Sequence, residues 1–230
     1  MNNPLFDGQD LRTTPTYKEQ AYALIKDAIL FNRFRVGAVY SQDSICKELG
    51  ISRTPVREAL LELQKDGYIA FSRGKGVIVV PVDKESAHNI LEARFYGEKL
   101  NASLAAQRAT DDEIAQIQKS LDQLCAQLDT RDGQHLYRLD HQFHRTIAAA
   151  THNKILLNQS AVLLDHYLRF ETKSVYNNSI DANIVFQEHV VICEAIKNRL
   201  PDKAEQAMER HLTNSYRRTV NQFWEKDSKP

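Results

Sequence analysis

Residues 41–67 read SQDSICKELGISRTPVREALLELQKDG, and this stretch decides the fold of the first part of the chain. Ser41 is a typical N-cap for a short helix, and Gly50 is placed where left-handed backbone would end that helix. Ser52 is placed to cap a second helix, and Pro55 falls in its first turn, where a missing N–H is harmless. Two helices joined by so tight a turn predict a helix-turn-helix.

The residues on either side of this stretch predict a third helix and a β-hairpin. Apolar residues with a helical period precede it and are expected to share one face: Tyr17, Ala21, Leu24, Ile25, Ala28 and Phe31. Residues 68–72 and 77–81 are expected to be strands, because the segment between them supplies the glycines of a tight turn. The expected order is helix, helix, helix, hairpin.

From Glu85 onward the chain shows only helical patterning, interrupted by polar or proline-containing segments. The expected helices span residues 85–108, 111–129, 133–150, 154–176, 181–199 and 202–224. Residues 1–15 have no period and are expected to be a flexible tail, and residues after 224 are expected to fray. The sequence therefore predicts a mostly α fold with two domains, at residues 16–82 and 83–226.

The composition changes at the same boundary and excludes several classes of protein. All eight histidines follow position 87, and residues 1–82 carry 11 basic against 9 acidic residues. The whole chain has a net charge of zero, which excludes a histone-like basic coat but allows a local basic surface. An apolar content of 42% excludes general disorder. No apolar run reaches the 18 or so residues of a membrane span.

The N-terminal residues and the cysteines indicate the cellular compartment. The first 15 residues lack a basic segment followed by an apolar one, so no secretion signal is expected. Three widely spaced cysteines contain no CxxC pair, which favours reduced thiols. A cytoplasmic protein is expected.

The second helix of the helix-turn-helix has a basic outer face. With Val56, Ala59, Leu60 and Leu63 turned inward, Arg57 points outward and Arg53 and Thr54 lie at the exposed N-terminal end. An arginine can bond both acceptors of guanine, and Thr54 with the free N–H groups of the first turn suits a phosphate. Arg73 and Lys75 flank the hairpin tip and are placed to reach DNA. The alternative is that these are ordinary solvated charges.

Four polar residues of the second half are candidates for a divalent metal site. Asp140 and His144 are four residues apart and share a helical face, while His189 and His211 are each in register with apolar residues. Neutral imidazoles and a carboxylate suit Zn, Ni or Mn. Two alternatives stay open: each histidine is an ordinary core residue with its own partner, or other histidines nearby in sequence, such as His141, compete for the role.

The first half resembles the winged helix-turn-helix of the GntR family of bacterial transcription regulators. The resemblance rests on SRTPVREAL at residues 52–60, on Leu63, on Asp66-Gly67-Tyr68 and on Gly74-Lys75-Gly76. It implies that Arg53, Thr54 and Arg57 contact operator DNA and that Gly74 approaches the minor groove. The chain departs from the family at Asp43, where a basic DNA-contacting residue is often found, so Asp43 is left out of the predicted site.

The second half resembles the FCD effector domain of the FadR subfamily. The resemblance rests on LEAR at residues 91–94 with Glu98, on DHQFH at 140–144, on Asn153, on Glu188-His189 and on Ala207 with His211. It implies an antiparallel helical bundle that binds a metal through Asp140, His144, His189 and His211. It also implies that the metal and Arg94 together place a small carboxylate; the alternative for Arg94 is a surface pair with Glu98.

These observations predict a ligand-responsive transcription regulator, a repressor that binds a palindromic double-stranded operator as a homodimer. Its effector would be a small organic acid sensed with a divalent metal. The main alternative is a metal-dependent enzyme acting on a small carboxylate, which leaves the helix-turn-helix unexplained and lacks an HExxH helix. A purely structural metal bundle is the third possibility.

Overall fold

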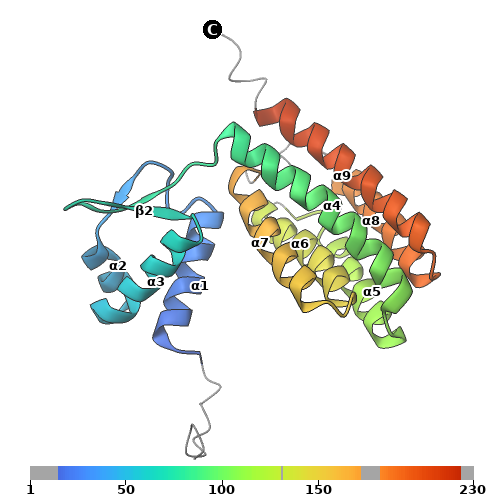
Figure 1. Cartoon of the computed structure of the whole chain (residues 1–230), viewed down its shortest axis with the longest axis horizontal. Helices are drawn as coiled ribbons and strands as arrows, with labels where there is room; N and C mark the ends of the chain where they lie inside the picture. The colour runs from blue at the N-terminus through green and yellow to red at the C-terminus, as the bar shows by residue number, and fades with distance from the viewer. Residues whose placement is uncertain (1–14, 131, 172–181, 224–230) are drawn as a thin grey trace, which may run out of the picture. The chain divides into compact units, whose positions relative to one another are not determined.

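The computed structural model describes residues 15–130, 132–171 and 182–223 (Figure 1). Contacts divide the chain into a first unit that ends at Pro81 and a second unit that begins at Val82. Residues 1–14 of the tail expected at 1–15, the frayed end and residues 172–176 of an expected helix lie outside the described residues.

The first unit contains three helices and a small sheet within its described residues. The helices are α1 (Tyr17–Leu30), α2 (Gln42–Leu49) and α3 (Arg53–Lys65). The strands are β1 (Val39–Tyr40), β2 (Ile69–Ser72) and β3 (Gly76–Val79), in the antiparallel order β1-β3-β2. Val56, Ala59, Leu60 and Leu63 of α3 are completely buried and form the centre of this unit.

The ends of α2 and α3 follow the sequence closely, with one exception. The Ser41 hydroxyl accepts a hydrogen bond from the Ser44 N–H, and Gly50 ends α2 with φ 67°. Ser52 occupies the N-cap position of α3, but its side chain makes no capping hydrogen bond. The expectation of a Ser52 side-chain cap is therefore wrong, although the helix begins where the sequence indicates.

Two further expectations for the first unit are corrected by the structure. The strand β1 was missed, and it adds to the hairpin by pairing Val39 with Ile78 and Tyr40 with Val77. On α1 the buried face is formed by Ala21, Ile25 and Ile29, so it is rotated away from the face expected from the sequence. Tyr17 and Leu24 are consequently 66% and 58% exposed.

The second unit is helical throughout its described residues. Its helices are α4 (Lys84–Arg108), α5 (Asp111–Cys125), α6 (Gly133–Ala149), α7 (Lys154–Glu171), α8 (Ala182–Lys197) and α9 (Pro201–Phe223). The mostly α fold, with a small β wing in the first unit and a helical second unit, is confirmed. None of the described helices combines the length and the apolar character that a bilayer span requires.

Two helices of the second unit end earlier than the sequence suggests. α5 ends at Cys125 because the next turns are closed by tighter hydrogen bonds, from the Gln127 N–H to the Leu124 carbonyl and from the Leu128 N–H to the Cys125 carbonyl. α8 ends at Lys197, since Arg199 adopts a left-handed φ of 56°.

The helix α4 positions the candidate site. It packs against α6, α7, α8 and α9, and three of its polar residues are buried among alanines: Arg94, Glu98 and Asn101. Burying a polar group is costly unless it has a partner, and inside the bundle Arg94 donates to Glu98 while the Asn101 side-chain amide donates to Ser160.

Candidate DNA-binding surface and metal centre

The N-terminal end of α3 presents basic and hydroxyl side chains to the solvent. Arg53, Thr54 and Arg57 are exposed, while the opposite face of the helix is buried in the core of the first unit. The first-turn N–H groups of a helix point outward with partial positive charge, which suits phosphate. This end of α3 therefore combines side chains and backbone donors that fit the DNA backbone and the base edges.

The tip of the hairpin is also exposed and basic. Arg73, Gly74 and Lys75 all face the solvent between β2 and β3. Gly74 has a φ of 70°, which favours glycine. Gly76 lies so close to β1 that a Cβ atom there would come within 2.1 Å of the Tyr40 carbonyl oxygen. The strand β1 therefore helps to set the conformation of the hairpin from which the basic tip projects.

Asp43, which is not part of the predicted DNA-binding site, lies at this surface and binds Arg53. The Arg53 Nε donates to Asp43 Oδ1 at 2.9 Å, and Nη2 donates to Oδ2 at 2.9 Å. The pair connects the first turn of α2 with the first turn of α3. Its partners are ten residues apart on different helices, so no short-range sequence pattern indicates the contact.

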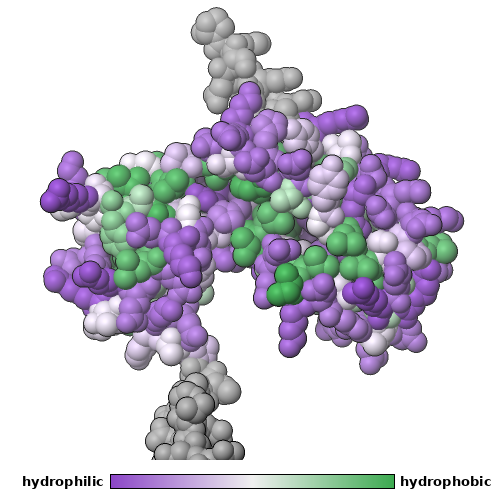
Figure 2. Space-filling view, viewed as in Figure 1, coloured by the Kyte–Doolittle hydropathy of each residue, from purple (hydrophilic) through white to green (hydrophobic). Residues whose placement is uncertain are grey.

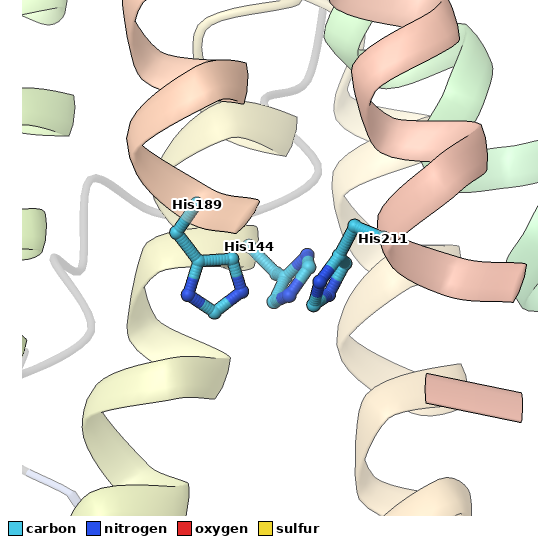
Figure 3. Close-up of side chains that lie close together, drawn as sticks. All are labelled: His144, His189 and His211. Atoms are coloured by element: carbon cyan, nitrogen blue, oxygen red, sulfur yellow. The ribbon is translucent and has the colours of Figure 1, made fainter. Parts of the chain in front are cut away.

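Three buried histidines from three helices converge in the second unit. Figure 3 shows His144 of α6, His189 of α8 and His211 of α9 with their rings gathered between the helices. One ring nitrogen from each lies within 4.8 Å of the others. Such a set of imidazole nitrogens in one small volume is the arrangement that a divalent transition metal requires.

Asp140 lies beside two members of this histidine cluster. Its Oδ1 is 3.4 Å from Nε2 of His189, and its Oδ2 is 4.0 Å from Nε2 of His144. The structure thus brings together the four residues proposed from the sequence, with the three histidines forming the tight group and the carboxylate at its edge.

Two glutamates that the predicted metal site omitted hold the histidine rings from behind. Glu188 accepts a hydrogen bond from Nδ1 of His211 at 2.9 Å. Glu98 of α4 contacts Nδ1 of His144. A carboxylate on one ring nitrogen fixes the tautomer and orients the other nitrogen toward a metal. Both glutamates stand within the stretches that carry the resemblance, but only the fold shows which histidine each one holds.

The protonation of the site favours ligation. Burial lowers the pKa of His189 well below its usual value, and the neighbouring His211 and His144 lower it further. Burial also lowers the pKa of His211, although its hydrogen bond to Glu188 opposes that shift. Both imidazoles are therefore neutral, which is the form that binds metals.

Several buried nitrogens of the cluster are without a conventional partner. Both ring nitrogens of His189 and Nε2 of His144 make no hydrogen bond with the described residues, although Asp140 lies near them. A buried polar atom left unsatisfied costs about 1–3 kcal/mol. A bound cation would satisfy one nitrogen of each ring, so the donor set fits a divalent metal.

Arg94 lies inside the bundle next to this cluster. Its Nε donates to Glu98, both side chains are almost fully buried, and its guanidinium lies 4.1 Å from the centre of the Tyr167 ring. Burial alone would raise the pKa of Glu98, but Arg94 and His144 hold it well below its usual range. The alternative of a surface pair is corrected: the pair exists, but it is buried and connects Arg94 to His144.

A cavity of about 620 Å³ lies between α4 and α9, and Arg94 forms part of its wall. Apolar and polar residues share the lining, among them Leu91 and Phe95 of α4 and Ser215 and Tyr216 of α9. The volume suits a small organic molecule. The described lining of the cavity includes Arg94 but none of the four candidate metal ligands, which lie deeper in the bundle.

Other histidines of the second unit have different partners. His152 contacts Glu113 at 2.8 Å, and His166 contacts Arg169 at 3.1 Å. His141 is buried with its ring near Tyr137 and Tyr167. Within the described residues, only His144, His189 and His211 form a group with metal-ligand spacing.

Comparisons with protein families divide the chain in the same way as its structure. Residues 17–79 match the family described as bacterial regulatory proteins, gntR family. Residues 89–214, more than half of the chain, match the FCD domain.

Characterised relatives and solved structures agree with these matches. The chain is 28% identical to the HTH-type transcriptional repressor NanR of Salmonella arizonae, with 99% of this chain and 95% of that protein aligned. The NanR of Salmonella typhimurium is 27% identical over similar shares, 99% and 95%.

Among solved structures, E. coli McbR/YncC has a TM-score of 0.81 at 18% identity, covering 91% of this chain and 100% of that one. A putative transcriptional regulator GntR from Rhodococcus sp. RHA1 has a TM-score of 0.74 at 19% identity, covering 90% and 98%. At these identities the structural likeness shows a shared fold.

Proposed function

Because the chain belongs to the gntR family of bacterial regulatory proteins and carries an FCD domain, we propose that it is a ligand-responsive transcriptional repressor. Residues 16–82 bind operator DNA, and residues 83–226 sense a small carboxylate with the help of a divalent metal. The observation that carries the proposal is the convergence of three buried imidazoles beside a buried arginine in the unit that follows the helix-turn-helix.

DNA binding is assigned to the exposed basic surfaces of the first unit. The start of α3 enters the major groove, and the hairpin tip reaches the backbone or the minor groove. The residues that contact DNA are Arg53, Thr54, Arg57, Arg73, Gly74 and Lys75, all of which are exposed. An N-terminal helix end with two arginines supplies both phosphate contacts and guanine recognition.

The metal is assigned to His144, His189, His211 and Asp140, with Zn, Ni and Mn as the candidate ions. When bound, the ion supplies positive charge and open coordination positions for an oxygen ligand. Glu98 and Glu188 hold the rings of His144 and His211 in the orientation that ligation needs.

The effector is assigned to the space next to Arg94. A guanidinium and a cation together favour a carboxylate over neutral ligands, because both contribute charge-assisted contacts. The cavity between α4 and α9 has room for a small acid and is walled in part by Arg94. Tyr167 supports the guanidinium from one face.

A homodimer is proposed because one chain offers one recognition helix, whereas palindromic operators are matched by two-fold symmetric proteins. The second unit also exposes large apolar side chains on α4 and α7: Tyr96, Leu100, Ile155 and Val162. Figure 2 shows hydrophobic residues at the surface over the part of the helical unit in which these helices lie. An exposed apolar patch of this kind is typical of a protein interface.

The proposal is tested by selecting DNA fragments that the metal-loaded protein retains and then adding small carboxylates to the complex. We expect the affinity of the protein for the selected DNA to change when its effector acid is added. Removal of the metal with a chelator should abolish this response. The acid is recovered unchanged. Catalytic consumption of an acid, with no ligand-dependent change in DNA binding, would contradict the proposal and favour a metal-dependent enzyme.

A further inference from the structure

The ion pair between Asp43 and Arg53 has a specific two-pronged geometry at the surface assigned to DNA. Both contacts, Nε to Oδ1 and Nη2 to Oδ2, measure 2.9 Å. A second contact between the same helices lies beside it, where the Gln42 Nε2 donates to the Arg53 carbonyl at 3.1 Å. The start of α2 therefore holds both the backbone and the side chain of Arg53.

Stability of the fold does not account for this pair. The side chains of Arg53 and Asp43 are 74% and 66% exposed. Exposed ion pairs contribute little to the free energy of folding, because water and salt screen them. What the pair does accomplish is to restrict the Arg53 side chain, which would otherwise sample many rotamers.

The restriction leaves the useful end of the guanidinium open. An arginine carries five N–H donors in a planar fork. Asp43 occupies one donor on Nε and one on Nη2, along one side of the fork. The donors of Nη1 and the second donor of Nη2 point away from Asp43, and this end of the fork matches the O6 and N7 acceptors of guanine.

We propose that Asp43 is a positioning residue that holds Arg53 for end-on recognition of a guanine in the major groove. A preorganised side chain loses less conformational entropy on binding, so its contact with the correct base is stronger. The inference rests on the proposed role of Arg53 in DNA binding.

The charge of Asp43 has a second consequence for selectivity. A carboxylate at a DNA-binding surface repels phosphates and lowers affinity for all sequences, while a guanidinium already paired with it is a poorer general phosphate ligand. Asp43 thus weakens non-specific binding and strengthens recognition of one base. Removing it is expected to change these two quantities in opposite directions.

The test uses the full metal-loaded chain and a random-sequence DNA duplex library, from which the wild-type protein enriches a motif. Affinities for that motif, for its single-base variants and for random duplex are then compared among wild type, Asp43→Ala, Asp43→Asn, Arg53→Ala and the double variant. Glu48→Ala is the matched control, because it removes an exposed carboxylate from the same helix. Melting curves establish that each variant is folded.

The expected result is a loss of about tenfold in discrimination at one guanine in Asp43→Ala, together with tighter binding to random duplex. Arg53→Ala loses discrimination at the same position, and the double variant loses no more than Arg53→Ala. Asp43→Asn, which keeps one acceptor oxygen, is intermediate. Glu48→Ala binds random duplex more tightly but keeps its discrimination.

Three results would overturn the inference. If Asp43→Ala discriminates between bases as well as the wild-type protein does, the ion pair has no positioning role. The proposal that α3 and the hairpin tip bind DNA is then unaffected. If Asp43→Ala affects a base that Arg53→Ala does not, Asp43 reads that base itself, as a carboxylate can do with cytosine. If the wild-type protein enriches no motif, sequence-specific binding fails, and the inference fails with it.

Discussion

Arg57 projects from the exposed face of α3, one helical turn beyond the end that holds Arg53. If it reads a base, Arg57→Ala weakens binding to the preferred sequence by about 1–3 kcal/mol and leaves binding to random DNA almost unchanged. Competition titrations on both DNAs measure the difference. Lys65→Ala, at the other end of the same helix, is the control. An equal loss on both DNAs would instead identify Arg57 as a phosphate contact.

Glu188 is the residue whose removal should affect the metal without removing a ligand. Burial by itself would raise its pKa, but its hydrogen bonds with His211, Arg218 and Asn214 lower it to about 2, so the carboxylate is ionised. Glu188→Gln should therefore weaken metal affinity by about 10–100-fold, because the ring of His211 loses its charged acceptor.

The measurement for Glu188→Gln is a zinc titration against a chromophoric chelator. Glu194→Gln is the matched control, since Glu194 lies on the same helix, is exposed and contacts Lys197. Unchanged zinc affinity in Glu188→Gln would show that the ring of His211 needs no such support.

At the residue scale, the sequence predicted which residues the fold brings together at the candidate metal site, but not the glutamates that hold two of their rings. Asp140 and His144 are recognisable because a separation of four places them on one helical face. Glu98 and Glu188 reach histidines on other helices, at contacts separated by 46 and 23 positions in the chain. No local period encodes such contacts, and only the packing of α4 and α8 in the bundle creates them.

Among the elements, the wing depends on a strand that the sequence did not reveal. β1 has two residues, too few to show an alternating pattern, and its pairing with β3 brings its backbone against Gly76. The longer helices were predictable because each shows several turns of periodic apolar residues. The ends of these helices were less predictable from the sequence. Tight turns end α5 and a left-handed residue ends α8, and neither changes the period of the apolar residues.

Gly76→Ala tests the role of β1 in the wing. A Cβ atom would come within 2.1 Å of the Tyr40 carbonyl oxygen, at a φ of 122°. Because backbone would have to move, we expect the free energy of unfolding of the first unit to fall by about 3 kcal/mol or more.

The control for this variant is Gly74→Ala in the same turn, where the added Cβ meets nothing within 4 Å. There only the left-handed backbone is penalised, by about 1–2 kcal/mol. Denaturant titration of the full chain gives both values. Equal losses in the two variants would show that the wing can move away from β1 without cost.

For the molecule as a whole, metal should stabilise the second unit. An ion that binds only the folded state at 100 times its dissociation constant adds about 2.7 kcal/mol to the free energy of unfolding. Chelation should therefore lower the melting temperature of that unit, and His189→Ala should abolish the effect. His152→Ala, which removes an exposed histidine, should keep it. Calorimetry with and without zinc measures the melting temperature of each variant. If zinc does not change the melting temperature of the wild-type protein, the proposed metal site is refuted.

Coupling between sensing and DNA binding should depend on Arg94. Arg94→Lys keeps the positive charge next to Glu98 but loses the planar fork, so metal binding and operator binding persist. The response to a carboxylate should require about tenfold more ligand, which corresponds to a loss of about 1.4 kcal/mol in the free energy of ligand binding. Arg108→Lys on the same helix is the control. Fluorescence anisotropy of labelled operator during ligand titration reports the response, and a normal response in Arg94→Lys would remove Arg94 from the sensor.

The buried contact of Arg94 with Glu98 means that the sensor already contains a carboxylate of its own. Under the proposed function, an incoming acid would share the Arg94 guanidinium with this resident group, whose attachment to the same helix gives it a high effective concentration. The strength of this intramolecular ion pair would then help to set the acid concentration at which DNA binding changes.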